Sequence, residues 1–450
     1  MERCKIRRRS FVDNVFGSPT PVADGAVVRL PRSGVAFEPA QPLALLGDAA
    51  DDLLVVPGVV CVARASALAG RLSNDSTFVR VEWPESDVLM FRSRADGADA
   101  VAATLALLAS ATDGSGAAIT DVAPLHGFIA HQKMKSSEDP ELSPAIAAPA
   151  ETGRGAGSVI EVLDTGLAAE WAWPTDTVRE AAADDTDPLV GIFPGFLGRS
   201  AGHGTFVAGL CHQVAPSASV VVHRIASTEG FVDEATLART IDAIGTTSAP
   251  PDAVVMAFGG YSVKLGSFGT HGKGDSWTQP LLLRSSLRSL LERCPDLVVV
   301  ASAGNNESSD PCYPAAFAAD REFAGRVVSV GALDAAGYRW TSSNYGPWVT
   351  SSTLGVRLRG PYVEGREHPS NEPDGSPETF GSPSFASWSG TSFAAALVAG
   401  RIVELQAALV ADLGRPVPAT EAWRVLAASS KPQREGRSGV QILVDGVAHD

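Results

Sequence analysis

Hydrophobic and polar positions divide the chain into two folded regions joined by a polar segment. Residues 1–45 contain proline and glycine without a sustained period and predict a leader of uncertain order. Residues 46–134 predict a small domain, and residues 158–450 predict a larger one. Between them, residues 135–157 are rich in Pro, Gly, Ser and Glu and predict an exposed linker, because such a segment buries little apolar surface.

The first region alternates short apolar runs with two helical periods. The expected strands are 53–62, 77–83, 88–94 and one within 118–129, and the expected helices are 65–72 and 98–110. The order β-α-β-β-α-β is that of a small ferredoxin-like α+β unit.

The second region alternates buried apolar strands with helices. The expected strands are 158–163, 219–225, 253–257, 297–301 and 327–330, and the expected helices are 204–214, 234–244, 281–294 and 391–413. Strands of this kind joined by helices predict an α/β fold with a doubly wound parallel sheet that is covered on both faces. Residues 355–388 are rich in Gly, Pro and Ser and predict a long loop before the last helix.

Composition excludes some classes of function. The chain has 450 residues, of which 45% are hydrophobic and 19% charged, as in folded soluble proteins. Its net charge of −15 argues against nucleic-acid binding, because phosphate neutralisation needs clustered Lys and Arg. No apolar run reaches the ~20 residues that cross a bilayer, and no secretory signal follows the basic run Lys5–Arg9. We therefore expect no membrane partner and a cytoplasmic location, with secretion as the alternative.

The cysteines and one acidic run suggest no metal chemistry. The five cysteines are scattered without a CxxC pair, so they predict buried thiols and neither a disulfide framework nor a zinc site. Cys312 could pair with another cysteine in an oxidising compartment. The run Asp184–Asp187 could bind a cation, but a solvated acidic loop is the favoured interpretation. We expect no cofactor for the chemistry.

Three polar residues stand out because glycines flank them. Asp164 lies in the segment VLDTG at the end of an expected strand, His203 lies in GHGT, and Ser392 lies in SGTSFAA. The last two segments each open an expected helix. Because sites in open parallel sheets form outside the carboxyl ends of the strands, where helix N-termini also point, we expect these side chains to converge.

This set of residue types is typical of nucleophilic catalysis. A serine hydroxyl is a poor nucleophile at neutral pH and needs an adjacent base, and imidazole can accept and return the proton. A buried carboxylate fixes the tautomer of the imidazole and stabilises its charged form. The sequence therefore predicts Ser392 as nucleophile, His203 as general base and Asp164 as the residue that orients His203. Each motif alone has a plainer interpretation as a turn or a helix cap, and the prediction depends on their joint occurrence.

A fourth segment adds an oxyanion donor. Asn305 lies in ASAGN, directly after the apolar strand expected at 297–301. Its side-chain amide and the backbone N–H of Ser392 are expected to donate to the oxyanion of a tetrahedral intermediate.

These blocks resemble the subtilisin-like serine proteases, the subtilase family. The order Asp, His, Ser along the chain is the subtilisin order. The blocks DTG, GHGTFVAG and GTSFA look like the family's three signatures, AGN resembles its oxyanion block, and together they cover residues 156–445. The resemblance implies a subtilisin-like catalytic domain that hydrolyses a peptide or protein substrate through an acyl-enzyme. Ala396 and Leu397 depart from the Pro and His that the family usually has there, which bears on local helix geometry.

The resemblance also implies where the substrate binds and what the first domain does. VMAFGG resembles the strand that pairs with substrate, and the expected substrate-binding residues are Ala257, Phe258, Gly259, Ala301, Ser302, Ala303 and Gly304. The N-terminal α+β unit looks like an inhibitory prodomain that is removed autocatalytically, with its processing site in residues 135–157. Family members often carry structural calcium, although no loop here has the ligand spacing of an EF-hand.

Two other functions remain open at this point. One is a catalytically idle subtilisin fold that serves as a binding scaffold. The other is a peptide ligase or macrocyclase, in which an amine replaces water in the attack on the same acyl-enzyme.

Overall fold

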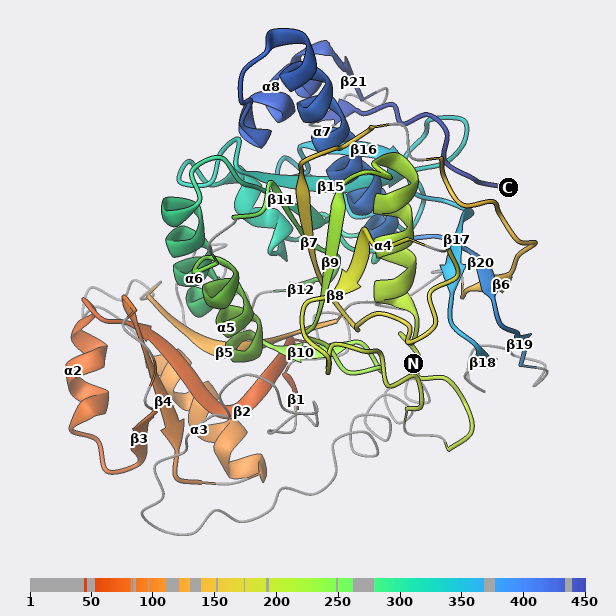
Figure 1. The fold of residues 1–450 in the computed structure, drawn as a ribbon. Helices are drawn as coiled ribbons and strands as arrows, with labels where there is room; N and C mark the ends of the chain where they lie inside the picture. The colour runs from red at the N-terminus through yellow and green to blue at the C-terminus, as the bar shows by residue number, and fades with distance from the viewer. Residues whose placement is uncertain are drawn as a thin grey trace. The chain divides into compact units, whose positions relative to one another are not determined.

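The computed structural model divides into two compact units, each described here by itself (Figure 1). It describes residues 44–46, 53–81, 83, 86–95, 97–110, 121–129, 139–150, 153–173, 175–191, 194–247, 250–261, 279–367, 377–433 and 439–450. The expected leader lies outside the described residues, apart from Ala44 and Leu45 at the start of β1 (Ala44–Leu46).

The first unit contains the expected β-α-β-β-α-β order. Its elements are β2 (Leu53–Ala63), α2 (Ala67–Ser73), β3 (Phe78–Val81), β4 (Val88–Ser93), α3 (Gly97–Ser110) and β5 (Val122–Ile129). The strands lie in the order β5-β2-β4-β3 and pair antiparallel. Val60, Phe91 and Val122 are fully buried in the core of this unit. The ferredoxin-like element order predicted from the sequence is therefore confirmed.

The first unit also includes two segments that the sequence pattern placed in the second domain. These are residues 232–242 and 260–289. The buried carboxylate of Glu234, at the start of α5 (Glu234–Ile244), accepts the backbone N–H of His126 at 3.0 Å and that of Leu283 at 2.9 Å. One side chain thus joins three stretches of this unit that are distant in sequence, and the domain boundaries at 45, 134 and 157 stay predictions.

In the described part of the chain, the second unit is built on a nine-stranded sheet. Its strands, in spatial order, are β8 (Val178–Glu180), β9 (Ser219–Arg224), β7 (Val159–Asp164), β11 (Ala253–Met256), β13 (Val298–Ser302), β15 (Val327–Leu333), β16 (Ser351–Leu354), β22 (Val440–Gln441) and β21 (Lys431–Pro432). Every neighbouring pair from β8 to β22 is parallel, and only β21 pairs antiparallel. The predicted α/β fold with a parallel sheet is confirmed.

Helices α4 (His203–Val214) and α7 (Thr391–Leu413) pack against each other and against one face of this sheet (Figure 1). Side chains on the opposite face, such as Val254 and Val299, are also fully buried, which explains the near-continuous apolar strands. Helix α7 is long and apolar enough to cross a membrane, but 61% of its apolar window is buried inside the protein, as in a core helix.

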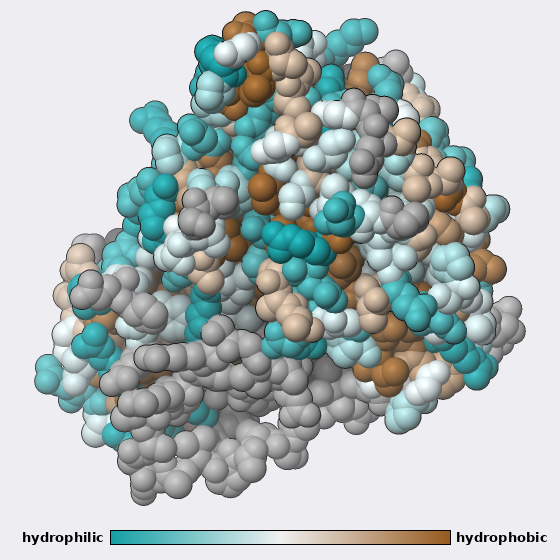
Figure 2. Space-filling view, viewed as in Figure 1, coloured by the Kyte–Doolittle hydropathy of each residue, from teal (hydrophilic) through white to brown (hydrophobic). Residues whose placement is uncertain are grey.

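Some of the exposed large apolar residues lie at single positions on the outer helices. Val410 and Leu413 near the end of α7 and Val425 in α8 (Ala419–Ser429) are exposed. Figure 2 shows brown residues interspersed with teal ones over these two helices. Further elements are β10 (Phe231–Asp233), β12 (Gly260–Tyr261), α6 (Leu281–Arg293), β14 (Cys312–Tyr313) and the 3-10 helix Ala315–Ala319.

The expected loop at residues 355–388 is wrong in part, because it contains strands. β17 (Leu358–Tyr362) and β20 (Ser384–Trp388) pair antiparallel, and β6 (Glu141–Leu142) adds a third strand beside β20. β18 (Gly365–Arg366) pairs with β19 (Thr379–Phe380) further along. Short strands with an internal proline lack the period that identifies a strand, whereas here burial of residues such as Trp388 stabilises them.

Leu210 and Leu413 provide a test of where the core lies. Leu210 in α4 is fully buried and Leu413 at the end of α7 is 52% exposed. We expect Leu210→Ala to lower the free energy of unfolding by about 2–5 kcal/mol, because it leaves a cavity. The matched change Leu413→Ala should stay within about 0.5 kcal/mol of the parent protein. Urea unfolding followed by circular dichroism measures both, and equal losses would contradict the assignment of the core.

Candidate active site

The register of β7, β11 and β13 places the carboxyl ends of these three strands side by side. Leu163 in β7 lies opposite Met256 in β11, and Met256 lies opposite Ala301 in β13. The next residue along each strand therefore lies at the carboxyl edge of the sheet. These residues are Asp164, Ala257 and Ser302, and two of them were predicted to contact substrate.

Asp164 and His203 form a buried hydrogen-bonded pair. Nδ1 of His203 lies 2.7 Å from Oδ1 of Asp164, and neither side chain is exposed. The backbone N–H of Thr165 donates to the same carboxylate oxygen at 2.8 Å. Because Nδ1 faces a carboxylate it carries the proton, which leaves Nε2 as the basic nitrogen of the neutral ring. The ring of Trp388 meets the imidazole edge-on and that of Phe393 lies tilted against it, with centroids 5.5 and 5.4 Å from that of the imidazole. The two contacts and the hydrogen bond to Asp164 fix the orientation of the imidazole.

Ser392 lies in the first turn of α7 and is 3% exposed. Its hydroxyl donates to the carbonyl oxygen of Ala257 at 2.9 Å. The next residue, Phe393, is the one that packs on the imidazole of His203. The hydroxyl of Ser392 is thus directed to the end of β11 at the carboxyl edge of the sheet, and a catalytic set of Asp164, His203 and Ser392 stays a prediction. Catalytic hydrogen bonds often tighten only when substrate is bound, and a rotation about χ1 redirects the hydroxyl.

Asn305 is oriented by the residue before the serine. Its Oδ1 accepts the backbone N–H of Thr391 at 3.0 Å and the hydroxyl of Thr391 at 2.8 Å. The same hydroxyl oxygen accepts the N–H of Gly304 at 3.0 Å. Two donors on Oδ1 settle which end of the amide is oxygen, so the Nδ2 group points away from Thr391. The backbone N–H of Ser392 lies in the first helical turn, where such groups have no acceptor within the helix.

Sequence reasoning missed Asn344, which holds the loop that carries Asn305. Its Nδ2 donates to the carbonyl of Ala303 at 2.8 Å, and its backbone N–H donates to the carbonyl of Gly304 at 2.9 Å. Its Oδ1 accepts the N–H groups of Asn306 and Ser308, both at 3.0 Å. A single buried amide therefore fixes this loop along its length.

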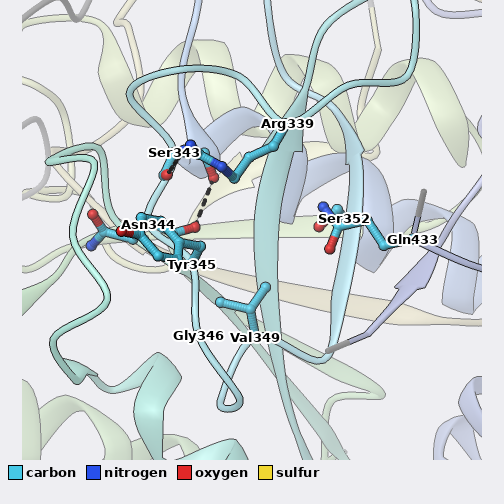
Figure 3. A pocket seen from close by; sticks show the side chains of 8 residues that line it. All are labelled: Arg339, Ser343, Asn344, Tyr345, Gly346, Val349, Ser352 and Gln433. Carbon is cyan, nitrogen blue, oxygen red and sulfur yellow. Dashed lines mark hydrogen bonds between the residues drawn. The ribbon is translucent and has the colours of Figure 1, made fainter. Parts of the chain in front are cut away.

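Asn344 also lines a small cavity. The cavity measures about 10 Å³, and Arg339, Ser343 and Gln433 are among its other lining residues (Figure 3). The guanidinium of Arg339 donates to the carbonyl of Ser343 at 2.6 Å. A volume of this size corresponds to about one water molecule, so it is not a substrate site.

The expected substrate strand already pairs with another segment of the chain. Gly259 and Ile129 exchange two backbone hydrogen bonds, each 3.0 Å long, as an antiparallel bridge. Ile129 is the last residue of β5. The backbone at Gly259 therefore pairs with an extended segment of this chain, and its role as a substrate-binding strand stays a prediction.

Sequence reasoning named Cys312 only as a thiol and missed its place beside the expected site. It is fully buried, and a Cβ built on Gly259 or Gly304 would lie 2.5 or 3.1 Å from its sulfur. The sulfur thus fills the space between the expected substrate strand and the oxyanion loop. None of the cysteines in the described residues forms a disulfide, which confirms buried thiols for Cys61, Cys211, Cys294 and Cys312 and leaves Cys4 outside the described part.

One residue of the acidic run Asp184–Asp187 differs from the expectation. Asp187 is 3% exposed, so the expected solvated loop is wrong at this position. Burial raises the pKa of Asp187 to about 6, and hydrogen bonds from Gly202, Leu189 and Thr165 oppose that rise. Among the residues that the structure describes, no three His, Cys, Asp or Glu side chains are grouped to hold a metal ion.

Comparison with known proteins identifies one family. The model of the Subtilase family matches residues 155–421, more than half of the chain. No curated protein matches this chain. Similar solved structures include a cold adapted subtilisin-like serine proteinase, with 17% identity over 68% of this chain and 96% of that chain and a TM-score of 0.43. Another is the prenylagaramide maturation protease PagA, with 20% identity over 63% of this chain and 86% of that chain and a TM-score of 0.44.

Gly204 and Gly70 provide a test of the close contact behind the histidine. A Cβ on Gly204 would clash with the carbonyl oxygen of Gly166 and lie 3.1 Å from Cβ of Asp164, whereas one on Gly70 in α2 would meet nothing within 4 Å. We expect Gly204→Ala to destabilise the protein by about 1–3 kcal/mol, because backbone cannot give way cheaply. Gly70→Ala should stabilise it by up to about 1 kcal/mol through helix propensity. Thermal unfolding of both variants measures this, and equal shifts in Tm would refute the clash.

Proposed function

The chain belongs to the subtilase family of serine proteases, and from that premise we propose that it is an endopeptidase that cleaves peptide bonds through an acyl-enzyme at Ser392. The observation that carries the proposal is the buried Asp164–His203 pair, 2.7 Å long, at the sheet edge where the hydroxyl of Ser392 contacts the end of β11. A buried charge of this kind has a large desolvation penalty, and active sites are where such penalties concentrate.

Each residue then has one role in the reaction. Nε2 of His203 takes the hydroxyl proton as the oxygen of Ser392 bonds to the substrate carbonyl carbon, and Asp164 stabilises the imidazolium. The oxyanion accepts hydrogen bonds from Nδ2 of Asn305 and from the N–H of Ser392. The imidazolium gives its proton to the leaving amine as the C–N bond breaks. Water attacks the resulting ester in the same way, which releases the acid and restores the hydroxyl.

The substrate is proposed to bind as an added strand along Ala257–Gly259. The two-way pairing of Gly259 with Ile129 supports this, because main-chain hydrogen bonds are how an extended peptide joins an exposed strand. The walls of the primary pocket are proposed to be the segments 257–260 and 301–304, whose small and apolar side chains favour an uncharged residue before the scissile bond. Cys312 sets the depth of that pocket.

A serine-directed probe tests the nucleophile. We expect a fluorophosphonate to label the parent protein and the control Ser429→Ala, whose serine is exposed at the end of α8, but not Ser392→Ala. The rate of hydrolysis of labelled casein should fall on the order of a million-fold in Ser392→Ala, the scale known for loss of the nucleophile in subtilisin.

Two results would contradict this proposal in different ways. Equal labelling of parent and Ser392→Ala, or no labelling of either, would indicate an idle fold that binds without cleaving. Products that are joined, and so lack the mass of an added water, would indicate a ligase or macrocyclase.

The same register supports a proposal of self-processing. In an antiparallel pair, each step forward on one strand is a step back on the other. In any strand that pairs in this way, the second residue after the one opposite Gly259 lies opposite Ala257, whose carbonyl accepts the hydroxyl of Ser392. In the sequence the second residue after Ile129 is His131, which lies outside the described residues. We propose that the chain cuts itself after His131.

This position is upstream of the segment in which the sequence analysis expected processing. Of that segment, residues 135–138, 151 and 152 lie outside the described part. Further along, Glu141 and Leu142 pair with β20, and the N–H of Ser143 donates to the carbonyl of Phe385 at 3.0 Å. A cut after His131 would leave these contacts intact.

Mass analysis of the N-terminus tests the position. We expect purified protein to begin at Gln132, and Ser392→Ala to keep all 450 residues. Ile129→Pro should slow the cut, because proline has no N–H to donate to Gly259, while Ile129→Val should cut normally. A new N-terminus within 139–157 would contradict the register, and full activity of an intact chain would refute self-processing.

A further inference from the structure

Asp187 connects the segment that carries Asp164 to the segment that carries His203. Its Oδ2 accepts the backbone N–H of Gly202 at 2.8 Å and the hydroxyl of Thr165 at 3.1 Å. Thr165 directly follows Asp164, and Gly202 directly precedes His203. Oδ2 of Asp187 thus accepts hydrogen bonds from the residue that follows Asp164 and from the residue that precedes His203.

Thr165 extends this connection to the other side of the histidine. Its hydroxyl oxygen accepts the backbone N–H of Gly204 at 3.1 Å. Gly202 and Gly204 are therefore both tied to Asp187, the first directly and the second through Thr165. The other oxygen of Asp187, Oδ1, accepts the N–H of Leu189 at 3.0 Å, which anchors the carboxylate in its own loop.

The bonds from Gly202 and Gly204 cap a helix that lacks a cap of its own. Helix α4 begins after Gly202, which has no side chain to accept a first-turn N–H. A carboxylate near a helix N-terminus is favoured by the aligned peptide dipoles as well as by hydrogen bonds. Asp187 supplies that charge from a distant point in the chain.

The ionisation of Asp187 decides whether these three bonds can form together. An ionised carboxylate only accepts, whereas a protonated one turns one oxygen into a donor, and each oxygen here faces donors. Burial raises the pKa of Asp187 to about 6, so the carboxylate is ionised at neutral pH and gains a proton as the pH falls through that value. The titratable groups whose charges act on it are Asp164 at the end of β7 and Tyr362 in β17. His203 follows Gly202 directly at the start of α4.

We propose that Asp187 is a positioning residue that holds His203 in line with Asp164 for proton transfer, and that it does so only when ionised. This rests on the proposed function, because it concerns the proton that His203 takes from Ser392. A carboxylate that only stabilised the fold would change the amount of active protein. A positioning carboxylate changes the rate of each active molecule and its dependence on pH.

The test is the pH dependence of kcat for casein hydrolysis, expressed per active site counted with the fluorophosphonate. In the parent protein Asp187 gains a proton as the pH falls through about 6, so log kcat should fall there with the loss of the ionised carboxylate. In Asp187→Asn this contribution is absent, so the slope of its log kcat against pH should be shallower than in the parent. At pH 8 its kcat should be lower by about 10²-fold at an unchanged KM, because a small misplacement of a catalytic group has effects of that size.

Asp184→Asn is the matched control. It removes the same charge from the same run, but Asp184 is exposed and should leave kcat and the slope unchanged. If Asp187→Asn does not fold, Thr165→Val replaces it, because it removes the hydroxyl between Asp187 and Gly204 at nearly constant volume. It should lower kcat, and Thr165→Ser should restore most of the rate.

The possible outcomes separate the two proposals. An Asp187→Asn variant that keeps the parent's kcat and the parent's slope of log kcat against pH overturns the role of Asp187 and leaves the proposed function standing. A parent that hydrolyses nothing and takes up no probe overturns both.

Discussion

The hydrogen bond between Asp164 and His203 joins two polar side chains that have no solvent exposure. Removing a carboxylate from water has a large penalty unless other donors replace the water. Here the replacement comes from Nδ1 of His203 and from the N–H of Thr165. The aromatic rings of Trp388 and Phe393 then exclude solvent from the imidazole. The pair is stable only if both partners are held in place, so the strand end and the helix start that supply them must be fixed to each other.

The packing of α4 against α7 brings the other half of the site to the same place. A Cβ on Gly400 in α7 would lie 2.7 Å from Cβ of Val214 in α4, so this glycine lets the two helices approach closely. Near their N-termini, the rings of Phe206 and Phe393 contact each other at a tilt, with their centroids 4.6 Å apart. In each of these two contacts, the residue of α4 and the residue of α7 are about the same number of residues from the N-terminus of their helix. The helices therefore run side by side in the same direction, and His203 and Ser392 in their first turns come together.

The parts of this site that lie in short sequence blocks could be predicted from the sequence. Asp164 ends an apolar strand, and Ser392 opens an apolar helix, so local pattern places both at the sheet edge. Trp388, which forms part of the wall around His203, lies in a stretch that the pattern assigned to a loop, because its strands are short and are stabilised by long-range burial. Asp187 and Asn344 act through bonds to residues that are distant in sequence, and a single sequence carries no signal of such pairs.

The hydrogen bond of the Ser392 hydroxyl implies that, in the proposed chemistry, substrate binds before this hydroxyl turns to His203. In the structure it donates to the carbonyl of Ala257, an acceptor that would be left buried and unpaired if the hydroxyl turned to His203. Leaving such a group unpaired costs about 1–3 kcal/mol. Gly259 and Ile129 exchange both backbone bonds, and hydrogen-bonded pairs alternate along an antiparallel ladder. A substrate strand in that register therefore donates its own N–H to Ala257, so the hydroxyl can turn to the imidazole once substrate is bound.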